Sequence, residues 1–141
     1  MITFSVPTPE QLSEVRLNTK ATPMEDTKGI VALDEDGEVQ GGFLADSFTY
    51  ASCQGHIWIN KKIILKYKFL EEICYYVYGT CGLTTLIATI SFKNHKSLKL
   101  MQNIGFTELA VIKDGFKLGE HMMIMTMRAE ECRFFKQEEA A

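Results

Sequence analysis

The first part of the chain alternates between short apolar stretches and polar breaks, which predicts small elements joined by turns. Residues 2–6 alternate weakly and indicate a short strand. Thr8 then fits the N-cap of a helix, because Pro9 follows at the first helical position and Gln11 lies three residues after the cap. Residues 19–28 are polar and predict a loop, either on the substrate side of a site or a plain connection.

A β-hairpin and a further strand are predicted next. Residues 29–33 and 39–44 are apolar and flank Asp36-Gly37, a pair that favours a tight turn between two strands. Residues 55–63 are rich in Ile and Trp and predict another strand. The N-terminal half is therefore expected to form a meander of neighbouring strands.

The pattern then changes to the helical period. Apolar residues recur at helical spacing between Phe69 and Val77, and either Gly79 or Gly82 is expected to end this helix. Residues 83–92 (LTTLIATISF) form a β-branched run that is typical of a central strand buried on both faces.

The C-terminal part predicts one helix and two strands. Residues 94–106 (NHKSLKLMQNIGF) begin with an N-cap residue and end at Gly105, as a capped helix does. Residues 107–112 and 121–127 indicate two strands separated by a loop that contains Asp114-Gly115. A charged tail, residues 129–141, is expected to be helical if it is ordered.

The predicted order is strand, helix, three strands, helix, strand, helix and two strands. Helices separate strands in the C-terminal half, so at least one strand pair should be parallel. The pattern predicts an α/β fold, with a mixed (α+β) sheet and helices covering its faces.

Composition narrows the class of protein. The 141 residues are 46% hydrophobic and 23% charged, which is ordinary for one globular domain over residues 1–141. A net charge of −3 argues against a nucleic-acid partner held by bulk charge. No apolar run reaches the roughly 18 residues of a membrane span, and the N-terminus lacks a signal-peptide pattern, so we expect a cytoplasmic protein with no membrane partner.

The four cysteines do not predict a metal site or a disulfide. They are Cys53, Cys74, Cys81 and Cys132, without C-x-x-C spacing. Cys74 and Cys81 lie seven residues apart on a predicted helix, roughly 10 Å along its axis, which is too far for a disulfide. We expect structural thiols.

A cluster of lysines precedes the helix that contains Phe69. It consists of Lys61, Lys62, Lys66 and Lys68. Lysines near a helix N-terminus favour phosphate binding, because free backbone N–H groups there carry partial positive charge. A solvated basic turn is the alternative interpretation.

The order of elements resembles that of the GCN5-related N-acetyltransferases, the GNAT family, over nearly the whole chain. In that family an Asn-x-x-Ala/Ser helix ends in Gly-Phe, and Asn94, Ser97, Gly105 and Phe106 stand at those places, with Gly82 at the turn before the preceding strand. The ending HMMIMTMRAEEC is similar to the Met-rich final strand of small GNAT-like proteins of tailed bacteriophages. The resemblance implies a mostly antiparallel sheet with one splayed parallel pair and about four helices.

The resemblance also implies a coenzyme A site. Counted back from Asn94, the pyrophosphate loop falls on residues 62–67, where Lys62 replaces an Arg or Gln and Leu65 and Tyr67 occupy glycine positions. Side chains there leave the backbone N–H donors in the chain but crowd the ligand. The implied cofactor-binding residues are Ile57, Trp58, Ile59, Lys62, Leu65, Lys66, Tyr67, Lys68, Asn94 and Ser97.

For catalysis, His56 is the candidate general base, in phase with Trp58 on the strand that the resemblance sets beside the thioester. A structural His and a Trp that is simply part of the core are the alternatives. Glu35 and Glu120 are weaker candidates because both fall in predicted turns, and nothing in the sequence marks Cys53 as an activated nucleophile. Many family members have a Tyr as general acid where this chain has Met101, which cannot donate a proton.

Two functions remain open. The first is an acyl-CoA-dependent N-acyltransferase that moves acetyl from acetyl-CoA, without a metal, to a primary amine of a protein or small molecule. The second is a GNAT-fold binding or structural module without catalysis, for instance in a phage particle or against a host protein. The resemblance also admits a homodimer and, for a phage protein, the host cytoplasm.

Overall fold

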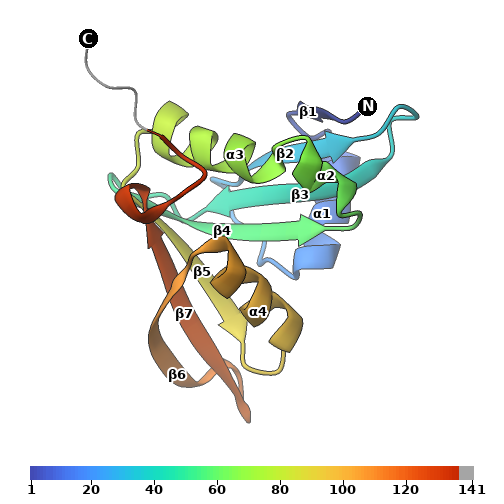
Figure 1. Cartoon of the computed structure of the whole chain (residues 1–141). Helices are drawn as coiled ribbons and strands as arrows, with labels where there is room; N and C mark the ends of the chain where they lie inside the picture. The colour runs from blue at the N-terminus through green and yellow to red at the C-terminus, as the bar shows by residue number, and fades with distance from the viewer. Residues whose placement is uncertain (137–141) are drawn as a thin grey trace.

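The computed structural model describes residues 1–136, which form one seven-stranded sheet with helices on both faces (Figure 1). The strands are β1 (Thr3–Ser5), β2 (Lys28–Leu33), β3 (Val39–Asp46), β4 (Ser52–Ile59), β5 (Thr85–Ser91), β6 (Thr107–Lys117) and β7 (Glu120–Arg128). The helices are α1 (Pro9–Thr19), α2 (Ile63–Lys66), α3 (Phe69–Cys74) with a π-helical extension (Tyr75–Thr80), and α4 (His95–Ile104). None of these helices is long and apolar enough to cross a membrane.

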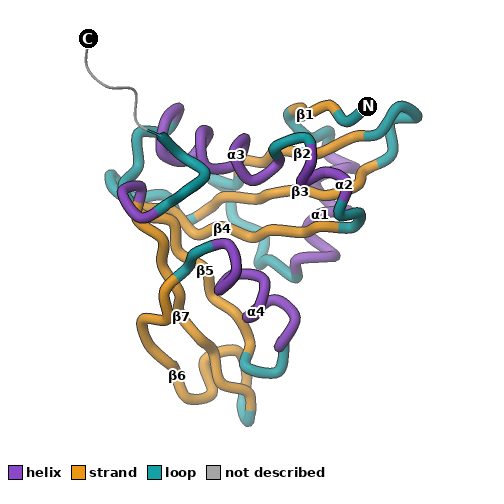
Figure 2. The backbone as a smooth tube through the Cα atoms, viewed as in Figure 1, coloured by secondary structure: helices purple, strands orange, loops and turns teal. Residues whose placement is uncertain are grey.

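The sheet has the order β1-β2-β3-β4-β5-β7-β6, and its strand pairs are antiparallel except for β4 and β5. That parallel pair holds only from Ser52–Thr85 to Gln54–Ile87. Beyond this point the two strands diverge, as the backbone trace in Figure 2 makes visible. The predicted mixed sheet with one splayed parallel pair is confirmed.

Both helix starts that were predicted from capping residues are confirmed. The Thr8 side chain accepts the N–H of Gln11, and the Gln11 side chain accepts the N–H of Thr8, which completes a capping box. At α4 the Asn94 side chain accepts the N–H of Ser97 at 3.1 Å. Gly105 ends that helix with a φ of 122°, a conformation that glycine adopts more readily than other residues.

The core has a separate cluster on each face of the sheet. Val15 of α1 packs with Val31 and Leu44 on one face. The larger cluster, on the face that α3 and α4 cover, is built around Phe43 and Phe69, both fully buried. Burying side chains of this size stabilises the fold by about 1.5–3 kcal/mol each, so the position of β3 and β4 is fixed from both sides.

The strand predicted over residues 55–63 ends earlier, at Ile59. Asn60 and Lys61 both donate their N–H groups to the carbonyl of Gln40, which terminates the ladder with β3. The following residues turn into α2 instead of continuing the strand. Branched Ile63 and Ile64 favoured a strand in the sequence, but Ile64 is fully buried from within this helical turn.

Three further predictions needed correction or refinement. The loop expected at Asp114-Gly115 lies inside β6 as an irregularity of the pairing, and the turn to β7 comes at Gly119, whose φ is 82°. The helix predicted to end at Gly79 or Gly82 is α3 with its π-helical extension, which begins at Phe69 and ends at Thr80, before Gly82. The tail has only one 3-10 turn, Ala129–Glu131, and residues 137–141 lie outside the described part.

Candidate functional site

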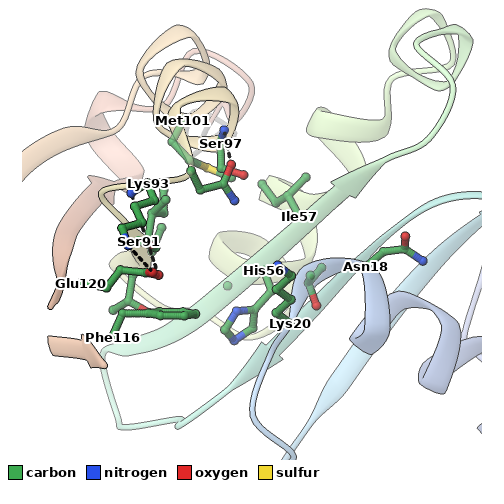
Figure 3. Close-up of a pocket in the computed structure, with 16 residues that line it drawn as sticks. Asn18, Lys20, His56, Ile57, Ser91, Lys93, Ser97, Met101, Phe116 and Glu120 are labelled. Atoms are coloured by element: carbon green, nitrogen blue, oxygen red, sulfur yellow. Dashed lines mark hydrogen bonds and ion pairs between the residues drawn. The ribbon is translucent and has the colours of Figure 1, made fainter. Parts of the chain in front are cut away.

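A cavity of about 430 Å³ occupies the wedge where β4 and β5 separate (Figure 3). Its lining comes from five places: the C-terminal end of α1, the middle of β4, the second half of β5, the start of α4, and the β6–β7 hairpin. Five segments that are distant in sequence therefore meet where the parallel pair of strands β4 and β5 separates.

The wall formed by β4 is a strand edge without a strand partner. At the closed end of the wedge, the backbone N–H groups of Thr84 and Thr85 donate to the carbonyl of Ala51. Ala51 therefore directs its backbone groups toward β5. Backbone groups alternate between the two edges of a strand, and the β3–β4 register is unbroken. The N–H and C=O groups of Gly55, Ile57 and Ile59 therefore point into the wedge, and no strand in residues 1–136 pairs with them.

His56 lines this cavity and is held by a buried carboxylate. Its Nε2 lies 2.9 Å from Oδ2 of Asp46, and the side chains are 15% and 4% exposed. The other carboxylate oxygen, Oδ1, accepts a hydrogen bond from the Ser47 hydroxyl. In neutral His56 a proton on Nε2 satisfies Asp46, which leaves Nδ1 as the nitrogen that can accept a proton.

A second polar group lies across the cavity, on β5 and the β6–β7 hairpin (Figure 3). The Ser91 hydroxyl donates to Glu120 at 2.5 Å, and the amines of Lys93 and Lys117 lie 3.7 and 4.0 Å from the same carboxylate. The Ser91 hydrogen bond, aided by the two lysines, lowers the pKa of Glu120 below its usual value. Glu120 was predicted to lie in a turn, but it begins β7 and its side chain is buried.

Helix α4 supplies the third wall. Asn94 and Ser97 line the cavity near the start of the helix, and Met101 lines it one turn further along. Met101 is 4% exposed and packs into the core. This wall contains no phenol that could act as a general acid, in agreement with the sequence.

The residues expected to form the pyrophosphate loop do not line this cavity. The side chains of Lys62, Leu65, Lys66, Tyr67 and Lys68 are all exposed. The backbone N–H groups expected to remain as donors are used within the chain: Leu65 donates to Lys62, Tyr67 to Ile64 and Lys68 to Leu65, at 3.0, 3.1 and 3.2 Å. Any anion bound here would have to be held mainly by lysine side chains.

The remaining candidates are distributed differently. Ile57 lines the cavity, whereas Trp58 packs against the α1-side cluster, so the core interpretation of Trp58 is the one the packing supports. Cys53 is fully buried, and burial raises its pKa to about 12, which keeps the thiol protonated. Glu35 lies in the β2–β3 turn and pairs with the N-terminal amine.

Asp46, Ser91 and Lys20 are among the residues at the site that sequence reasoning missed. Asp46 is the only charged residue of strand β3, and that isolated charge was the one available signal. Ser91 and Lys20 carried no signal, because only the pairing of distant segments brings them to the cavity.

The fold defined by this splayed sheet is that of the GCN5-related N-acetyltransferases. The spermidine N-acetyltransferase SpeG from Vibrio cholerae in complex with CoA and spermine superposes with a TM-score of 0.73 at 13% identity, over 92% of this chain and 96% of that one. The manganese complex of the same Vibrio enzyme superposes with a TM-score of 0.72 at 12% identity, over 90% of this chain and 92% of that one. A protein assigned as a phosphinothricin N-acetyltransferase superposes with a TM-score of 0.68 at 19% identity, over 91% of this chain and 98% of that one. No protein-family model and no curated protein sequence matches the chain.

Proposed function

We propose that the chain is an N-acyltransferase that moves an acetyl group from acetyl-CoA to a primary amine by direct attack. The observation that carries the proposal is the wedge itself, with the free edge of β4 on one wall and the His56–Asp46 pair beside it. A free strand edge pairs with an extended amide-containing chain by main-chain hydrogen bonds, and the pantetheine arm of coenzyme A is such a chain. We assign the whole chain, residues 1–141, to this one domain.

Each residue of the wedge has a role in this mechanism. Acetyl-CoA supplies an acyl group activated as a thioester. The amine nitrogen forms a bond to the acyl carbon as the carbon–sulfur bond breaks, and its proton passes to Nδ1 of His56, directly or through water. Asp46 orients the ring and stabilises the positive charge that develops on it. The N–H of Ile57 supplies a donor for the charge on the carbonyl oxygen, and the departing thiolate takes its proton from solvent.

The phosphate end of coenzyme A fits the residues less well. Lys62, Lys66 and Lys68 offer positive charge, but the N–H groups of Leu65 and Tyr67 are committed within the chain. We therefore propose that side-chain charge supplies the attraction to the phosphates, with Asn94 and Ser97 near the pantetheine arm. Binding of this kind weakens as salt screens the lysines.

Thermal melting with and without acetyl-CoA tests the proposal. A ligand that binds the folded protein at one hundred times its Kd stabilises it by about 2.7 kcal/mol. We expect a higher Tm with acetyl-CoA, and release of free thiol when small amines are added, spermine among them because the Vibrio enzyme was solved with it. No change in Tm at millimolar acetyl-CoA would rule out the acyltransferase.

A catalytically inactive binding module is the second candidate. The committed N–H groups near Leu65 and Tyr67 and the buried Met101 favour it. In that case acetyl-CoA would leave the Tm unchanged, or would raise it without thiol release from any amine. The phage relationship, the cytoplasmic location and a homodimer stay predictions from sequence that accompany either candidate.

A further inference from the structure

We infer that the amine acceptor also carries a carboxylate or another oxyanion, and that Lys20 binds it. This inference rests on the proposed function and names its substrate class. It comes from the charged side chains that line the cavity on the side of His56.

Lys20 lies at the end of α1, where the chain turns toward the wedge. Its φ is 60° and its ψ is 25°, the left-handed conformation that glycine usually occupies at the end of a helix. A non-glycine residue in this conformation is uncommon and often marks a functional position. Lys20 lines the cavity together with His56, and both lie on the same side of it in Figure 3.

The cavity contains two lysines and one carboxylate, and the carboxylate is already bound. Glu120 accepts the Ser91 hydroxyl and has Lys93 and Lys117 within ion-pair distance. Lys20, in contrast, has no carboxylate within 4.0 Å among residues 1–136. Among residues 1–136, Lys20 is therefore the cation lining the cavity that has no carboxylate partner and can pair with a ligand.

Within residues 1–136, the carboxylates at or beside the cavity that could bind a second ammonium group already have partners. The Asp46 side chain is buried, and its two carboxylate oxygens are hydrogen-bonded to His56 and Ser47. A polyamine would therefore meet Lys20 and Lys93 without a carboxylate of its own to pair with. An acceptor with one amine near His56 and one oxyanion near Lys20 matches these charges, because a charge-assisted hydrogen bond is stronger than a neutral one.

A purely structural role is the alternative for Lys20. A cation at the C-terminal end of a helix interacts favourably with the helix dipole. That role would affect the stability of the protein but would not distinguish acceptors with and without a carboxylate, so acceptor selectivity is the property to measure.

L-Lysine and cadaverine make the matched pair of acceptors, because they differ only by one carboxylate. Initial rates of thiol release give kcat/KM for each, with spermidine as a third acceptor. We expect the wild type to prefer L-lysine, and Lys20→Met to lower the ratio of the two kcat/KM values by about tenfold, mainly through the KM of L-lysine. Lys113→Met is the control, because Lys113 is exposed on β6 and does not line the cavity; it should leave the ratio unchanged.

A direct binding measurement keeps this inference separate from the proposed function. Chemical-shift changes in the NMR spectrum report L-lysine and cadaverine binding without acetyl-CoA, and we expect saturable changes around Lys20 and His56 for L-lysine that Lys20→Met removes. A preference for cadaverine or spermidine, or a ratio that Lys20→Met does not change, would overturn the inference while thiol release still supported the acyltransferase. If no amine were acetylated, the proposed function would fail, and the binding of L-lysine would then test the inference by itself. Saturable binding that Lys20→Met removes would support the inference. Absence of L-lysine binding would overturn it.

Discussion

The β4 wall of the wedge and the loop that follows it are adjacent in sequence but differ in how they are held. On β4, His56 is held by the buried Asp46, and the strand is packed between the two core clusters. In residues 62–68 only Ile64 is buried, and the lysines are exposed. The proposed catalytic pair is thus built into the core, whereas the candidate phosphate contacts depend on exposed charges. The two regions should respond differently to mutation, salt and pH.

The largest effect should come from His56→Ala. Loss of a general base typically lowers turnover by about 10²–10⁴-fold, and the buried Asp46 carboxylate would also lose its partner. Acetyl-CoA binding, measured by the rise in Tm, should be largely retained. Activity equal to that of the wild type would exclude His56 from the mechanism and remove the contrast between the two regions.

Asp46→Asn should have the next largest effect. The amide can still hydrogen-bond the ring but cannot stabilise its positive charge, so we expect a loss in kcat of about 10–100-fold, the range typical of residues that orient a functional His. The rise in Tm with acetyl-CoA should be largely retained. A lower Tm with an unchanged kcat would assign Asp46 a structural role only.

The loop is tested by Lys62→Glu and Lys66→Glu. If lysine side chains hold the phosphates, each reversal should weaken acetyl-CoA binding by about tenfold or more at low salt, since charge-assisted contacts contribute roughly 1.5–3 kcal/mol. The difference from the wild type should shrink as salt is added. Lys99→Glu, at an exposed position of α4, is the control. Equal effects of all three variants would indicate a general charge effect instead of a site.

A smaller effect is expected at the start of α4, which combines features of both regions. Asn94→Ala removes the N-cap hydrogen bond to Ser97 and should lower the free energy of unfolding by about 1 kcal/mol. Thermal or urea unfolding measures this change. Asn94→Asp keeps a capping oxygen and should restore most of the stability; failure to do so would mean that the cap is not what Asn94 contributes.

The smallest effect concerns the pH dependence of stability through Glu120. Ser91 and two lysines lower the pKa of Glu120 in the folded protein. The stability that the Glu120 carboxylate contributes is therefore present above the unfolded pKa of 4.5 and is lost as the pH falls through the folded pKa. Glu120→Gln should therefore be less stable than the wild type near pH 7, and the difference should narrow below pH 4.5. Urea unfolding at several pH values measures it, and a constant difference would contradict this linkage.

The sequence anticipated those features that depend on neighbouring residues. The capping box at Thr8, the N-cap at Asn94 and the turn glycines Gly37 and Gly105 were readable because a cap or turn is satisfied within a few residues. The end of β4 and the path of β6 through Asp114 were not readable. These depend on the carbonyl of Gln40 and on the irregular pairing with β7, which are contacts with other strands.

The same division between local contacts and contacts between distant segments applies to the functional site. The sequence by itself determined the order of elements and the helix caps, because local hydrogen bonds and apolar periodicity are properties of short segments. It pointed to His56 as a candidate base only through the resemblance to a known family. Only the tertiary structure decided that β4 and β5 part after Gln54 and Ile87, that Asp46 meets His56, and that Lys20 faces the same cavity. The physical reason is that strand pairing and core packing place residues far apart in the chain within a few ångströms of one another, and no local pattern encodes that distance.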